Sequence, residues 1–126
     1  MNTKLLMSVS AVLMGATGIL LIFIPQEIST YLELTGSGTI LLQLFGALYF
    51  GFAMINRTGK ANLIGGIYSR PIAIGNFTHF FIGAFALIKL ASANSSLTWV
   101  WIATVGYSLF AVLFGYIFFT SRVIKN

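Results

Sequence analysis

LLMSVSAVLMGATGILLIFI, residues 5–24, decides the fold, because it is a long uncharged stretch and three similar stretches follow it at residues 39–55, 72–90 and 98–119. The hydrocarbon core of a bilayer is about 30 Å thick and needs roughly 20 helical residues to cross it. None of the stretches alternates polar and apolar residues, so each predicts a helix and not a barrel strand. We therefore expect a single all-α domain over residues 1–126, a polytopic membrane protein whose four transmembrane helices form an antiparallel bundle.

The composition agrees with this prediction and excludes several classes of protein. Of 126 residues, 58% are hydrophobic and 7% are charged, against roughly 25% charged in an ordinary soluble domain. The net charge of +5 would indicate a nucleic-acid partner only if the basic residues formed one solvated patch, and they are spread over the ends of the apolar stretches instead. The chain has no cysteine, which excludes disulfides and sulfur-ligated metals.

The basic residues predict how the spans are oriented. Most of them lie before the first stretch, between the second and third, or after the fourth, namely Lys4, Arg57, Lys60, Arg70, Arg122 and Lys125. The other two connections hold Lys89 together with both glutamates, Glu27 and Glu33. By the positive-inside rule, both termini are expected in the cytoplasm. The first stretch is longer than the apolar part of a signal peptide and lacks a clean cleavage site, so we expect it to be a retained span.

A short helix on the outer surface is predicted after the first span. Pro25 suits a first helical position, Glu27 suits a helix amino terminus, and Gly36 can end the turn. Both glutamates would then face water or headgroups.

The second connection, residues 56–70, mixes basic and apolar residues and is expected to lie at the membrane interface. Arg57, Lys60 and Arg70 would sit at the depth of lipid headgroups, where each cation contributes about 1 kcal/mol of attraction to anionic lipid. The alternative is that they only determine the topology. Membrane lipid is the predicted partner in either case.

Small residues at helical spacing predict which faces of the spans touch other helices. The expected stripes are Ser8, Ala11, Gly15 and Gly18 in the first span, Gly46, Ala47 and Gly51 in the second, and Thr104, Ser108, Ala111 and Gly115 in the fourth. Large residues such as Phe110, Phe114, Phe118 and Phe119 are left to fill gaps or face lipid. Trp99, Trp101 and Tyr107 are expected to form an aromatic belt at the outer end of the fourth span.

Polar residues within the spans are the candidates for a ligand or solute contact. His79 is the only histidine and lies about 12 Å beyond Pro71, near the middle of the membrane. The other candidates are Asn76, Thr78, Gln43 and Tyr49. Polar groups in hydrocarbon are costly unless they are paired, and ionisable ones there are often functional. The alternative is that these groups only form hydrogen bonds between helices, which commonly contribute about 0.6 kcal/mol each.

Enzymatic activity is not expected. No acidic residue lies within the spans to orient His79 as a catalytic base, and a single histidine without cysteine cannot build a zinc or haem site. We predict no catalytic residue, no bound metal and no cofactor.

Three segments carry a resemblance to a known group: IPQEISTYLELTG at residues 24–36, LLQLFGALYFGFAMIN at 41–56 and RPIAIGNFTHFFIGAFALIK at 70–89. In pattern the chain resembles the small bacterial four-span proteins of the broad DoxX-like group. The resemblance implies a multi-pass protein of the bacterial inner membrane, whose relatives are mostly of unknown role. Gln43 stands where some related proteins carry an arginine, which puts a charge-based role at that position in doubt.

The sequence therefore favours a non-enzymatic membrane bundle that binds a small apolar or amphipathic ligand, or a partner membrane protein, through His79, Asn76 and Gln43. The alternative from another class is a small oligomeric channel or transporter in which the same groups line a solute path. A purely structural subunit is the third possibility. A second copy of the chain, forming a homo-oligomer, is a further candidate partner, beside another membrane protein.

Overall fold

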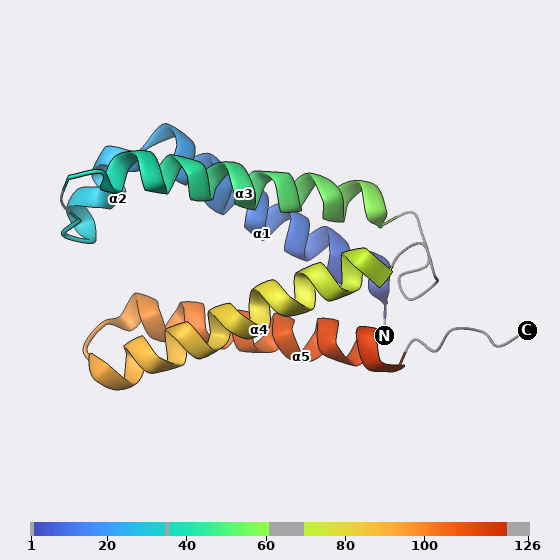
Figure 1. Ribbon diagram of the computed structural model, residues 1–126. Helices are drawn as coiled ribbons and strands as arrows, with labels where there is room; N and C mark the ends of the chain where they lie inside the picture. Colours follow the sequence, from blue (N-terminus) through green and yellow to red (C-terminus); the bar gives the residue numbers. More distant parts are fainter. Residues whose placement is uncertain (1, 35, 61–69, 121–126) are drawn as a thin grey trace, which may run out of the picture. The chain divides into compact units, whose positions relative to one another are not determined.

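The computed structural model of the chain describes residues 2–34, 36–60 and 70–120. Within them the chain is all-helical, with helices α1 (Thr3–Phe23), α2 (Pro25–Tyr31), α3 (Gly38–Gly59), α4 (Arg70–Ala93) and α5 (Thr98–Thr120) (Figure 1). Four of these helices, α1, α3, α4 and α5, are long and apolar enough to cross a membrane. The predicted fold class is confirmed: four spans and one short additional helix.

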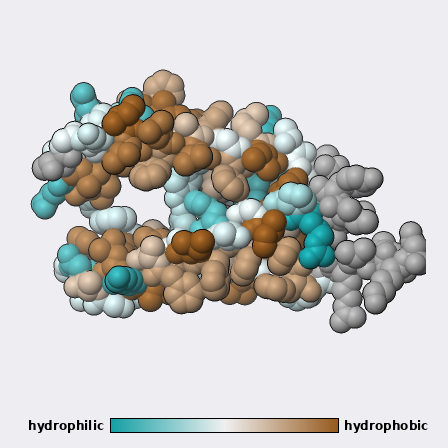
Figure 2. Space-filling model, in the orientation of Figure 1, coloured by the Kyte–Doolittle hydropathy of each residue, from teal (hydrophilic) through white to brown (hydrophobic). Residues whose placement is uncertain are grey.

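The helical surfaces are apolar on the outside as well as in the contacts between helices. Hydrophobic side chains cover much of the visible face in Figure 2. Val12, Ile102 and Val112 are each about 70% exposed, and at most 33% of the most apolar window of any span is buried. A water-soluble fold does not expose its largest aliphatic side chains in this way, whereas contact with lipid tails makes such exposure favourable.

The spans begin and end close to the predicted positions, with one correction at the end of α3. The helix continues through Asn56 and Arg57 to Gly59, so the second connection is shorter than predicted. No glycine or proline stands between Asn56 and Gly59, so the helix runs on to Gly59, and the backbone N–H of Lys60 still donates to the Asn56 carbonyl at 3.2 Å. The rest of the predicted interfacial segment, residues 61–69, lies outside the described residues.

The surface helix α2 begins as predicted, with Pro25 in the first turn and Glu27 near the amino terminus. It ends at Tyr31, earlier than predicted. The chain then turns through Glu33 and Gly36, which have φ angles of 56° and 65°. A positive φ is strained for most residues, so Gly36 supports the turn into α3 and does not terminate α2.

The chain divides into two units, Met1–Ala61 and Asn62–Asn126, each of which is a helical hairpin. In the first, α1 and α3 run antiparallel: Gly18 lies against Gly46, and Ser10 lies against Asn56. A Cβ placed on Gly18 would lie 2.8 Å from the Gly46 carbonyl oxygen, and a Cβ on Gly46 would lie 2.9 Å from the Gly18 carbonyl oxygen. The two backbones can approach this closely because neither residue has a side chain.

The predicted small-residue stripe of α1 is only partly the contact face. The buried residues of α1 are Leu6, Met7, Ser10, Met14 and Gly18, of which only Gly18 belongs to the predicted stripe. At Gly15 the two helices lie farther apart than at Gly18, since a Cβ on Gly15 would meet the Ala53 side chain at an ordinary 3.4 Å. In α3, Gly46 is buried as predicted, but Ala47 and Gly51 are exposed. That part of the prediction is wrong, because the buried face of α3 follows Leu42, Gly46, Ala53 and Asn56 at helical spacing and leaves Gly51 on another side.

The second hairpin, α4 with α5, is held by aromatic rings set against glycines. The Tyr107 ring occupies the space beside Gly83, and the Phe77 ring lies where a Cβ on Gly115 would approach within 2.9 Å. Phe80 stacks on Phe114 with ring centroids 5.8 Å apart and planes 6° apart. As predicted for the stripe of α5, Thr104, Ala111 and Gly115 are buried, and Ser108 is half-buried.

Two aromatic residues of α5 lie between the helices. Phe114 is fully buried there, so of the two predicted alternatives it fills a gap and does not face lipid. Tyr107 is not part of an outer belt, because its ring packs into the gap beside Gly83 within the hairpin. Trp101 lies near the start of α5, where its indole N–H donates to the Ser95 carbonyl at 3.1 Å. A Trp whose N–H has a partner while its ring stays exposed is typical of a membrane interface.

Replacing Gly18 by alanine is expected to destabilise the first hairpin. The new methyl group would lie 2.8 Å from backbone atoms of Gly46 and Phe50, which no change of rotamer can move. Overpacking of this kind costs about 1–3 kcal/mol of unfolding free energy, measurable by denaturant titration in mixed micelles followed by circular dichroism. The matched control is Gly51→Ala, which has nothing within 4 Å of the added carbon and is expected to keep full stability. An equal loss in both variants would contradict the close contact.

Candidate functional site

The polar candidates within the spans belong to both units. Gln43 and Tyr49 lie on α3, and both are half-buried. Asn76, Thr78 and His79 lie on α4, where Asn76 is buried, His79 is half-buried and Thr78 is exposed. Within the second hairpin, Asn76 and His79 therefore share a face because they are three residues apart, and Thr78 lies on a different one.

His79 is hydrogen-bonded across the second hairpin. Its Nε2 lies 3.2 Å from the hydroxyl oxygen of Tyr107 on α5. The Phe80 ring packs against both side chains in edge-to-face geometry. Its centroid lies 5.0 Å from that of the imidazole and 5.1 Å from that of the phenol ring. The close approach of Gly83 to the Tyr107 ring holds the phenol in this position. The sequence did not indicate this partner, because 28 positions separate the two residues.

Asn76 is anchored to its own helix. It is fully buried, and its side-chain amide donates to the Ile72 carbonyl at 2.9 Å. In the first hairpin, Asn56 plays a comparable part between helices: its amide donates to the Ser10 hydroxyl at 3.0 Å, and the Ser10 hydroxyl donates to the Met7 carbonyl at 3.0 Å. Sequence reasoning placed Asn56 at the start of a connection and missed this buried pair.

In the described part of the chain, every buried side-chain nitrogen and oxygen has a hydrogen-bond partner. The buried polar groups inside these spans are therefore satisfied by the protein, because hydrocarbon offers them no hydrogen-bond partner. Among the same residues, no group of three His, Cys, Asp or Glu side chains could hold a metal ion. The assignment of His79, Asn76, Gln43, Thr78 and Tyr49 to a ligand stays a prediction.

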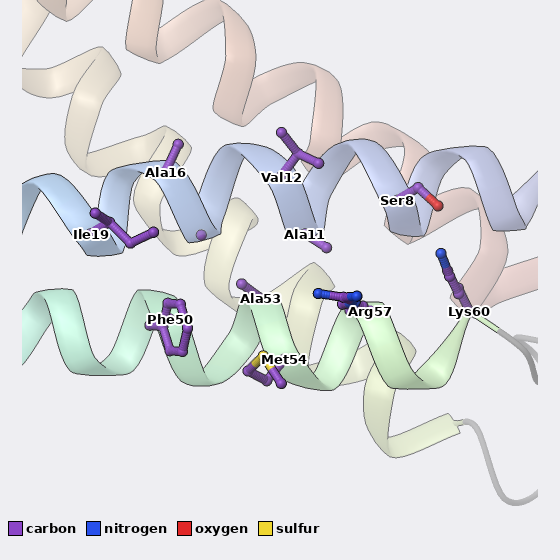
Figure 3. A pocket seen from close by; sticks show the side chains of 11 residues that line it. Ser8, Ala11, Val12, Ala16, Ile19, Phe50, Ala53, Met54, Arg57 and Lys60 are labelled. Atoms are coloured by element: carbon purple, nitrogen blue, oxygen red, sulfur yellow. The ribbon is translucent and has the colours of Figure 1, made fainter.

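A concave site exists elsewhere, along one side of the contact between α1 and α3. We call it the α1–α3 groove. It has a volume of about 480 Å³, within the range of about 300–1,000 Å³ that is usual for small-molecule sites. It is lined by Ser8, Ala11, Val12, Gly15, Ala16 and Ile19 from α1 and by Phe50, Ala53, Met54, Arg57 and Lys60 from α3 (Figure 3).

The groove forms because several small residues of α1 lie next to the face of this helix that packs on α3, and not on it. The two backbones come into close contact at Gly18 and Gly46, and the contact also includes Met14 and Ser10, which Asn56 of α3 approaches. Ser8 and Ala11 lie beside that line and are only half-buried. Because their side chains are short, they leave a hollow instead of filling the space next to α3.

The groove is apolar along most of its length and cationic at one end. Arg57 and Lys60 occupy that end, close to Ser8 at the start of α1 (Figure 3). No acidic residue lines the groove. Across residues 2–34, 36–60 and 70–120, neither the Arg57 guanidinium nor the Lys60 ammonium group has a hydrogen bond or an ion pair. The Ser8 hydroxyl donates to the Lys4 carbonyl at 2.8 Å, so its oxygen can still accept a hydrogen bond.

The three basic residues predicted to contact headgroups have different surroundings. Arg57 and Lys60 share the groove in the first hairpin. Arg70 lies at the start of α4, where its guanidinium carbon is 5.0 Å from the centre of the Phe118 ring on α5. This cation–π contact joins the start of α4 to the end of α5, so Arg70 has a structural role within the second hairpin.

Comparison with protein-family models, with curated proteins and with solved structures found no match. The likeness to the DoxX-like group therefore stays a prediction from the pattern of the sequence.

Removing the Tyr107 hydroxyl is expected to cost little but measurable stability. Tyr107→Phe keeps the ring against Gly83 and Phe80 but loses the bond to His79. Hydrogen bonds of this type average about 0.6 kcal/mol in membrane proteins, with an upper value of about 1.7. The free energy of unfolding in mixed micelles measures the loss. Tyr116→Phe, on an exposed residue of the same helix, is the control and is expected to be neutral. Equal stability of both variants would show that the His79–Tyr107 bond contributes nothing.

Proposed function

We propose that this chain is a non-enzymatic, multi-pass protein of the bacterial inner membrane that binds a small apolar or amphipathic ligand, and that the α1–α3 groove is the binding site. The observation that carries the proposal is the groove itself, an apolar hollow on a membrane-spanning hairpin, with two cations at one end whose side chains have no partner among the described residues. An amphipathic molecule has the matching distribution of polarity.

The channel hypothesis has less support. A solute path needs polar groups that can exchange partners with the solute, and two of the three candidates on α4 are bonded within the second hairpin, His79 to Tyr107 and Asn76 to Ile72. The groove is lined mainly by aliphatic and aromatic side chains, which offer nothing to a hydrated ion.

The orientation belongs to the same proposal. Because α1 and α3 are antiparallel, the start of α1 and the end of α3 lie at one end of the first hairpin. Lys4, Arg57 and Lys60 therefore share that end, and the glutamates of the α2 region lie at the other. The positive-inside rule then places the cationic end of the groove at the cytoplasmic leaflet.

Filling the groove is expected to abolish ligand retention. In the double variant Ala11→Leu/Ala16→Leu, the added branched side chains would occupy the hollow between the helices. Native mass spectrometry of gently extracted protein should show a bound amphipathic species on the wild type and at least about tenfold less of it on the variant, equivalent to about 1.4 kcal/mol.

The control for this experiment is Ala47→Leu, which makes the same change at an exposed position of α3 outside the groove. It is expected to retain the ligand. Wild-type protein that carries no bound species, or a loss that is equal in both variants, would overturn the proposed function.

The orientation is testable with single cysteines, since the chain has none of its own. Glu33→Cys is expected to react with a membrane-impermeant maleimide added to intact spheroplasts. Lys60→Cys is expected to react only after the membrane is permeabilised, because the positive-inside rule places it in the cytoplasm. Labelling of both cysteines from the same side would contradict a single membrane crossing by α3 between these positions.

A further inference from the structure

We infer that the ligand of the α1–α3 groove is an anionic phospholipid of the surrounding membrane, with one acyl chain along the groove and its phosphate on Arg57 and Lys60. The inference rests on the proposed function and specifies the class of ligand. Three features of the groove support it: its length, its charge and the character of its floor.

The groove has the length of one lipid leaflet. It runs along α1 from Ser8 to Ile19 and along α3 from Lys60 to Phe50. At 1.5 Å per residue these stretches measure about 16 Å and about 15 Å. Half of a hydrocarbon core of about 30 Å is about 15 Å. An acyl chain anchored at the cationic end would therefore have a groove about as long as one leaflet's share of the hydrocarbon core.

The charged end is suited to a phosphate group. Arg57 and Lys60 are three residues apart, so they lie on the same side of α3. Figure 3 shows Lys60 extending toward α1 at the Ser8 end of the groove. A guanidinium can bind two phosphate oxygens at once, and an ammonium adds a second, more mobile donor. The groove has no carboxylate to compete, since both glutamates of the chain lie in the region of α2, at the other end of the hairpin.

The floor of the groove favours a flexible chain over a rigid ligand. Ser8, Ala11 and Gly15 are small and allow methylene groups to lie close to the α1 backbone. Met54 has a flexible side chain that can adapt to a mobile partner. Free phosphate would use only the two cations and leave the apolar part of the groove without a ligand, so the length of the groove argues for a lipid.

The test is a lipid titration of the full chain in detergent micelles, read by native mass spectrometry. The probes are phosphatidylglycerol and phosphatidylcholine with identical acyl chains, plus inorganic phosphate. Wild-type protein is expected to bind phosphatidylglycerol at least about tenfold more tightly than phosphatidylcholine and not to retain phosphate. In Arg57→Gln/Lys60→Gln, affinity for phosphatidylglycerol should fall about 30-fold, equivalent to about 2 kcal/mol for two cations.

Two control variants separate the groove from general attraction between a basic protein and an anionic lipid. Lys4→Gln removes a cation at the same end of the hairpin that does not line the groove, and its affinity should stay within about twofold of wild type. The charge-conserving exchange Arg57→Lys/Lys60→Arg should keep the preference for phosphatidylglycerol. Helical content by circular dichroism and a monodisperse elution profile confirm that each variant is folded.

The outcomes distinguish this inference from the proposed function. Equal affinity for the two phospholipids, with binding still lost in Ala11→Leu/Ala16→Leu, would overturn the anionic lipid and leave an amphipathic ligand in the groove. A loss of affinity that is as large in Lys4→Gln as in Arg57→Gln/Lys60→Gln would overturn the specific phosphate site. Retention of inorganic phosphate alone, or of a partner protein in place of lipid, would also overturn the inference. Absence of any bound species from wild type would overturn both proposals.

Discussion

The constraint on which the structure depends is the hydrogen-bonding demand of the peptide group in hydrocarbon. With no water to accept or donate, each span must satisfy its own N–H and C=O groups, and a helix does so without help from its neighbours. This explains why helices form in α4 even around Gly75 and Asn76, residues with poor helix propensity in water. The same demand extends to side chains: Asn76 bonds to Ile72 in its own helix, and His79 bonds to Tyr107.

Lipid tails are as apolar as the side chains of the spans, so the hydrophobic effect does not drive helices together and packing must do it. The two hairpins solve this problem differently. In the first, Gly18 and Gly46 bring two backbones into contact, with the Asn56–Ser10 bond nearer the end of α3. In the second, rings from each helix fill the space left by a glycine of the other. The groove is a product of the first solution, since a contact made by glycines on one line leaves the neighbouring small residues uncovered.

Much of the fold could be predicted from particular residues, and most of the site could not. The four apolar stretches mark the spans, and Pro25 marks the start of α2. The stripe of small residues in α1 was found, but its meaning was misread: Gly18 is in the contact, whereas Ser8 and Ala11 line the groove. Helical spacing shows that residues share a face and does not show what that face touches. Tyr107 illustrates the same difficulty, because its position near the outer end suggested a belt and its ring lies against Gly83.

The sequence by itself determined that the chain is helical and embedded in lipid, because the length and polarity of a segment are local properties that suffice to choose its solvent. It also determined which charges flank the spans. Only the tertiary structure decided that Arg57 and Lys60 lie at one end of a groove that Ser8, Ala11 and Gly15 also line. The same is true of the hydrogen bond between His79 and Tyr107. Those relations depend on the rotation and offset of one helix against another. Close packing of many side chains sets these quantities jointly, and no single segment contains them.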